Sequence, residues 1–106
     1  FMQGIDYSGL EEIKNTGWHR KLHIFQYPLY YVEYGLAQMG AVQVWGNSLK
    51  DHAKAVRNYK TALAAGAKSL PELFSMAGGK FAFDEETMGE VIQLMENEIS
   101  ILKEKI

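Results

Sequence analysis

The sequence predicts an all-α fold of four to five helices, in one domain that spans residues 1–106. Apolar residues recur at spacings of three and four, which is typical of helices with one buried face. Helix-capping residues and glycines divide the chain into segments of helical length. The Asn-Gly and Asp-Gly pairs that favour β-hairpins do not occur in the sequence.

The composition restricts the class of protein. Apolar residues make up 47% of the chain and charged residues 23%, close to a globular average, which argues against disorder. With no cysteine, the chain has no disulfides, thiolate zinc ligands or cysteine nucleophiles. A net charge of −2 disfavours nucleic acid and anionic membrane as partners. No apolar run is long enough for a membrane span.

The start of the chain carries no basic-then-apolar signal peptide, so we expect a cytoplasmic protein. A sequence that begins with Phe1 is expected to be trimmed from a longer protein, and a fragment would not show the targeting signal of that protein.

The first half is expected to hold two helices around an ambiguous segment. Ser8 would cap a short helix over residues 9–15. Residues 18–27 permit either a helix or an extended loop. A long helix is predicted over 28–47, with Pro28 in its first turn. Glycines in mid-helix weaken it, so they indicate close packing or a nearby ligand. These small residues are Gly35, Ala37, Gly40 and Ala41.

The second half is expected to hold three helices. Asn47 or Ser48 would cap the first, which runs to about Ala65. Its predicted apolar face consists of Ala53, Val56, Tyr59, Ala62 and Leu63. Ser69 would cap a short helix that has Glu72 at its third position and Gly78 as its stop.

Residues 79–83 are predicted to form a loop, and Asp84 to cap the last helix. The same helix has acidic residues at its start and lysines at its end, which suits its dipole. Its predicted buried stripe consists of Met88, Val91, Ile92, Met95, Ile99, Leu102 and Ile106.

An aromatic block between His23 and Tyr34 is the main candidate for chemistry. It contains four of the six tyrosines: Tyr27, Tyr30, Tyr31 and Tyr34. On a helix that begins at Pro28, Tyr30 and Tyr34 would share a face. Phenolic hydroxyls gathered in this way can donate hydrogen bonds to a developing oxyanion. The alternative is an aromatic core with satisfied hydroxyls.

Weaker motifs do not support further chemistry. His19 and His23 have the spacing of two zinc ligands, but Arg20 and Lys21 lie between them and the glutamate base is missing. We therefore expect no metal on this chain. A glycine pair before Lys80 lacks the rest of a phosphate-binding loop.

The block resembles the C-terminal part of oligoendopeptidase F, a branch of the thimet-oligopeptidase family of zinc metallopeptidases. The similarity rests on Trp18, His23-Ile-Phe, Pro28-Leu-Tyr-Tyr-Val-Glu-Tyr34, Ala37-Gln38-Met-Gly-Ala41 and Trp45. It continues through Tyr59, Gly66, Leu70-Pro-Glu-Leu73, Ala77-Gly78 and Phe81-Ala-Phe83. Essentially the whole chain fits in the same order. Leu29 stands where the family commonly has phenylalanine.

The resemblance implies a helical C-terminal subdomain of a zincin-type oligopeptidase that cleaves short peptides. Zinc would be held by an H-E-x-x-H helix and a glutamate that this chain does not contain. His23, Tyr30 and Tyr34 would be catalytic, as stabilisers of the oxyanion, and Tyr27 and Tyr31 would bind substrate. The partners would be short peptides and the remainder of the peptidase chain.

The chain by itself is then expected to be inactive. An isolated fragment would expose apolar surface around His23 and is expected to self-associate. The alternatives are a non-catalytic peptide-binding or helical interaction module, and a purely structural helical domain.

Overall fold

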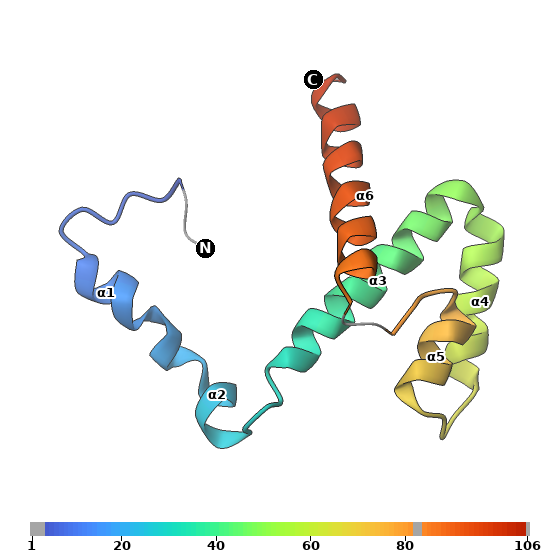
Figure 1. Ribbon diagram of the computed structural model, residues 1–106, viewed down its shortest axis with the longest axis horizontal. Helices are drawn as coiled ribbons and strands as arrows, with labels where there is room; N and C mark the ends of the chain where they lie inside the picture. The colour runs from blue at the N-terminus through green and yellow to red at the C-terminus, as the bar shows by residue number, and fades with distance from the viewer. Residues whose placement is uncertain (1–3, 82–83, 106) are drawn as a thin grey trace. The chain divides into compact units, whose positions relative to one another are not determined.

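The computed structural model describes residues 4–81 and 84–105, and these are helical, with no strand among them (Figure 1). They divide into two compact units, one that ends at Val32 and one that begins at Glu33. The all-α prediction is confirmed. Phe1, the loop position Phe83 and the stripe position Ile106 lie outside the described residues.

The described part of the first unit contains three short helical elements. They are α1 (Glu11–Thr16), the 3₁₀ helix η1 (Gly17–Arg20) and α2 (Leu22–Gln26). The predicted cap at Ser8 is wrong, because the Ser8 hydroxyl donates to Asp6 Oδ1 at 2.6 Å, and α1 begins two residues later than expected. Helical structure does not end at Gly17, because the 3₁₀ helix η1 begins at this residue. The ambiguous segment is therefore mostly helical.

The long helix starts later than predicted. α3 spans Val32–Lys50, while Pro28 to Tyr31 form a turn. Proline disfavours helical geometry in the residue before it, and Tyr27 accordingly has φ −133° and ψ 79°. Leu29 then adopts a left-handed φ of 67°. The prediction that Tyr30 and Tyr34 share a helix face is wrong, because Tyr30 precedes the helix.

α3 also ends later than predicted, at Lys50. Gly46 remains helical because it is buried against the side chain of Leu94. The predicted caps for the next helix are wrong: Ser48 donates its hydroxyl to the Trp45 carbonyl at 2.7 Å inside α3. The observed cap is Asp51, whose Oδ1 accepts the Lys54 N–H at 2.9 Å.

Three helices follow α3 in the second unit: α4 (His52–Ala64), α5 (Leu70–Ala77) and α6 (Glu85–Lys103). The predicted ends of α5 are confirmed. The Glu72 carboxylate accepts both the N–H and the hydroxyl of Ser69, at 3.0 and 2.7 Å, and Gly78 closes the helix at φ 86°. Asp84 caps α6 as predicted, because its Oδ1 accepts the Thr87 N–H at 2.7 Å.

In the second unit α4 and α5 pack on each other, and hydrogen bonds tie the segment after α5 to α3. Gln43 pairs through its side-chain amide with the backbone of Lys80, as donor to the carbonyl at 3.1 Å and acceptor from the N–H at 2.7 Å. The Asn47 amide donates to the Gly78 carbonyl at 2.8 Å. These bonds hold the segment that follows α5 against α3. Further along that chain, Lys80 pairs with Glu90 of α6 at 3.1 Å.

The buried apolar core is small and lies in the second unit. Among described residues it consists of Leu36, Ala55, Ala62 and Val91. On the predicted face of α4, Ala62 is buried, but Leu63 is 67% exposed. The predicted buried stripe of α6 is wrong for every described member except Val91, because the α6 side chains that contact α3 lie on a neighbouring face. None of the described helices has the length and apolar character needed to cross a membrane.

Candidate functional site

The first unit places His23 and three of the four predicted tyrosines in one aromatic cluster. His23 lies in the first turn of α2, and the turn after α2 brings the following residues back toward it. The ring centroids of His23 and Tyr30 are 5.9 Å apart, with an interplanar angle of 23°. The ring of Tyr31 lies 6.1 Å from that of His23, at 28°. Both tyrosines therefore stack on the imidazole.

Tyr27 completes this His23 cluster, which comprises His23, Tyr27, Tyr30 and Tyr31. The ring centroids of Tyr27 and Tyr30 are 6.1 Å apart and tilted by 59°. The backbone supports this contact, because the Tyr30 N–H donates to the Tyr27 carbonyl at 3.1 Å. The turn that Pro28 imposes therefore brings the aromatic rings together. The sequence had predicted that a helix would bring them together.

The tyrosines of the His23 cluster are open to solvent, whereas the imidazole is half-buried between them. Tyr27 is 60% exposed, Tyr30 42% and Tyr31 40%. A buried aromatic core, the alternative derived from the sequence, does not fit these exposures. Rings held in this way present a surface that a ligand can reach, with one imidazole and three phenols as polar groups.

Tyr34 belongs to the other unit. It lies in the first turn of α3 and is 48% exposed. The structure thus brings together His23, Tyr30, Tyr27 and Tyr31, and places Tyr34 on a separate element.

The two histidines with zinc-ligand spacing enter different aromatic clusters. The His19 ring lies 4.1 Å from that of Trp18, edge to face, and 6.5 Å from that of Phe25. His23 instead stacks on tyrosines. The helical course is broken between them at Lys21, which has ψ 78°. Within the described ranges, no three histidine, aspartate or glutamate side chains gather closely enough to hold a metal ion.

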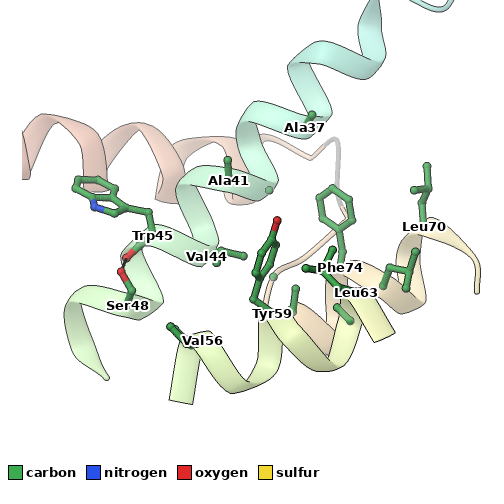
Figure 2. A pocket seen from close by; sticks show the side chains of 16 residues that line it. Ala37, Ala41, Val44, Trp45, Ser48, Val56, Tyr59, Leu63, Leu70 and Phe74 are labelled. Carbon is green, nitrogen blue, oxygen red and sulfur yellow. Dashed lines mark hydrogen bonds between the residues drawn. The ribbon is translucent and has the colours of Figure 1, made fainter. Parts of the chain in front are cut away.

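The second unit contains a cavity that was not predicted as a site. A cavity of about 550 Å³ lies in the second unit between α3, α4 and α5 (Figure 2). Figure 2 shows the ring of Tyr59 reaching from α4 toward α3, with Phe74 of α5 beside it. The signal in the sequence was the set of small residues on α3, since Ala37, Gly40 and Ala41 line this cavity.

The cavity suits packing better than catalysis. Its polar side chains are Tyr59, Ser48 and Trp45, and the Ser48 hydroxyl is used within α3. No acidic or basic side chain is found among the described residues that line it. General acid–base chemistry needs a titratable group within hydrogen-bond reach of the substrate, and the Tyr59 phenol is the one such group among the described residues of this lining.

The comparisons with known proteins identify no relative. No family model matches the chain, and neither a curated protein nor a solved structure matches it.

Proposed function

We propose that this chain forms the C-terminal part of a zinc metallo-oligopeptidase, where it supplies groups that bind the peptide and stabilise the oxyanion. The proposal joins the resemblance of the motif block to one observation, the stacking of Tyr30 and Tyr31 on His23. Three polar aromatic side chains are thereby held together on an accessible surface.

The metal in this proposal belongs to the rest of the enzyme. The described residues do not fit a zinc site, because they offer no group of ligands that could hold the ion. On its own the chain is expected to be inactive, and we assign the intact enzyme to the cytoplasm, which the small net charge and the absence of cysteine fit.

The chain's own residues would act as hydrogen-bond donors. When a peptide carbonyl becomes tetrahedral, negative charge develops on its oxygen, and an aimed donor lowers the barrier. The His23 N–H and the hydroxyls of Tyr30 and Tyr34 are assigned this role. One such donor is worth about 3 kcal/mol in other enzymes. Tyr27 and Tyr31 are assigned to the substrate, where a phenol can bond to the peptide backbone.

The exposure of the His23 cluster supports a peptide as the ligand. Extended peptides present backbone donors and acceptors together with apolar side chains, which match phenolic rings that have one polar atom. Each of the three tyrosines is 40–60% exposed, so a ligand can reach them. Binding of peptide without hydrolysis is the second candidate, and this exposure is the observation that favours it.

The test uses the intact peptidase that contains this segment. Tyr30→Phe and Tyr34→Phe keep each ring and remove its hydroxyl. We expect kcat to fall by about 10²–10³-fold for each, with KM changed much less, because the lost bond forms in the transition state. Initial rates with a fluorogenic short peptide measure both constants.

Tyr7→Phe is the matched control, since it removes a hydroxyl outside the motif block and should leave kcat unchanged. Unchanged turnover in both Tyr30→Phe and Tyr34→Phe would contradict the catalytic assignment. If the same variants raised KM alone, the tyrosines would be peptide-binding groups only.

A further inference from the structure

The helix α6 has two apolar faces, and the described residues of the chain cover only one of them. Thr87 and Val91 are buried, and Leu94 packs on Gly46 of α3. The other face carries large apolar side chains that are 43–55% exposed. They are Met88, Ile92, Met95, Ile99 and Leu102, and we call this set the α6 seam.

The α6 seam follows a heptad pattern. Successive members are four, three, four and three residues apart, which is the repeat that a partner helix covers in a coiled coil. Ile92 and Ile99 then occupy one type of core position, labelled a in a heptad. Met88, Met95 and Leu102 occupy the other, labelled d. Ile at a with Leu at d favours two parallel strands, and this seam has Ile at both a positions and Leu at one of the three d positions.

Charges beside the α6 seam support the same arrangement. Glu98 and Lys103 are five residues apart and flank the seam at the g and e positions. In a parallel pair of identical helices, each Glu98 meets Lys103 of the other copy, so two ion pairs form. An antiparallel pair centred on the seam would place Glu98 against Glu98 and Glu96 against Glu96.

The surroundings of the seam leave room for a second helix. In Figure 1 the C-terminal half of α6 extends beyond α3, within the second unit. The seam residues of this half, Ile99 and Leu102, are 48% and 55% exposed. We propose that α6 is a self-association surface: a second copy of this chain pairs with it as a parallel two-stranded coiled coil along the seam. This proposal does not depend on the peptidase function.

The test is the oligomeric state of the 106-residue chain. Sedimentation equilibrium between about 10 μM and 1 mM covers the range expected for a short interface. We expect a monomer–dimer equilibrium. Ile99→Asn places an amide in the seam and should weaken dimerisation by at least about tenfold, since each dimer loses two apolar contacts.

Ile101→Asn is the matched control. Ile101 is the same residue type, has a similar exposure of 43%, and lies off the seam. This variant should dimerise like the parent chain. Circular dichroism of both variants checks that their helix content is retained. A chain that stays monomeric up to 1 mM, or a dimer that Ile99→Asn leaves intact, would overturn the proposal.

Orientation is tested separately with charge reversal. Glu98→Lys alone and Lys103→Glu alone each bring like charges together in a parallel dimer, so both should associate more weakly. Mixing the two variants should restore dimerisation, because each copy then meets its opposite charge.

A single cysteine gives a second measure of orientation, since the chain has none of its own. Leu102→Cys should form an intermolecular disulfide on mild oxidation if the helices are parallel, because the two residues then face each other. An antiparallel pair would place Leu102 near Ile92 of the other copy. A dimer that does not crosslink, and is not rescued by mixing the charge variants, would overturn the parallel arrangement.

Discussion

Gly40 of α3 lies directly against the ring of Phe74 of α5. A Cβ built on Gly40 would approach Phe74 Cε1 to 2.7 Å, closer than carbon atoms pack. Phe81 packs edge to face on this ring with centroids 5.1 Å apart, so a ring displaced by the new methyl group would lose that contact. Close approach of α3 and α5 therefore depends on the missing side chain at Gly40.

Gly40→Ala should destabilise the chain by about 1–2 kcal/mol. Alanine raises helix propensity by up to about 1 kcal/mol, but the methyl group overpacks the contact with Phe74. Gly35→Ala in the same helix is the control, because a Cβ there meets nothing within 4 Å. It should stabilise by about 0.5–1 kcal/mol. Urea denaturation measures both, and equal effects would contradict the close contact.

Gln43→Ala should loosen the segment after α5. The variant loses both bonds to the Lys80 backbone, at a cost of about 0.5–1.5 kcal/mol, because water can replace them at this exposed position. Amide hydrogen exchange at Lys80 should become faster. The exposed Gln38 of α3 provides the control, and Gln38→Ala should change stability by less than about 0.5 kcal/mol.

Leu29→Gly should stabilise the turn between α2 and α3. Leu29 has φ 67°, a conformation that costs a residue with a Cβ about 1–2 kcal/mol. Its side chain is 91% exposed, so little packing is lost. After the entropy cost of glycine, we expect a net gain of about 0.5–1 kcal/mol. Leu29→Ala keeps the Cβ and should show no gain; thermal unfolding compares the two.

His23→Phe separates the donor role of His23 from its packing role. Phenylalanine can stack on Tyr30 and Tyr31 but has no N–H group. In the intact peptidase, kcat should fall by about 10²-fold or more while the thermal midpoint changes little. A large fall in the midpoint with normal kcat would show that the imidazole serves packing alone.

Two helix-capping carboxylates should make the chain sensitive to acid. The Ser69 hydroxyl and N–H lower the pKa of Glu72 below its usual 4.5. The Thr87 N–H and hydroxyl lower the pKa of Asp84 below 3.8. Both groups bind protons more weakly in the folded state, so their contribution to stability is complete above the unfolded pKa values. It is lost as the pH falls through the folded ones.

Helicity followed by circular dichroism from pH 6 to pH 2 should therefore decline below about pH 4. Ser69→Ala removes the stronger donor, so the pKa of Glu72 should rise toward 4.5 in an NMR titration. Asp84 should keep its lowered pKa in that variant, which makes it an internal control. A Glu72 pKa that does not change would contradict the bond between the two side chains.

Local signals in the sequence predicted the parts of the fold that depend on nearby residues. Ser69 and Asp84 begin their helices as predicted, because this kind of cap needs only a polar partner three residues away. Gly78 ends α5 as predicted, because glycine adopts a left-handed φ without strain. The start of α3 was predicted wrongly although Pro28 is an acceptable first-turn residue. The same proline also restricts Tyr27, and that second effect produced the turn.

The candidate site was predicted in its residues but not in its geometry. The concentration of tyrosines after His23 is visible in the sequence, whereas their stacking on the imidazole depends on the turn at Leu29. Helical periodicity predicted that Tyr30 and Tyr34 would lie on one face. That periodicity applies only inside a helix, and Tyr30 lies before it.

The sequence by itself determined that the chain is helical, where α5 begins and ends, where α6 begins, and where the polar aromatic residues concentrate. Only the tertiary structure decided which apolar faces are covered. Val91 and Ile92 are neighbours on the predicted stripe of α6, yet Val91 is 8% exposed and Ile92 52%. The physical reason is that periodicity in the sequence shows that a helix face is apolar, whereas burial of that face requires a partner. In α6, α3 contacts only one of the two apolar faces.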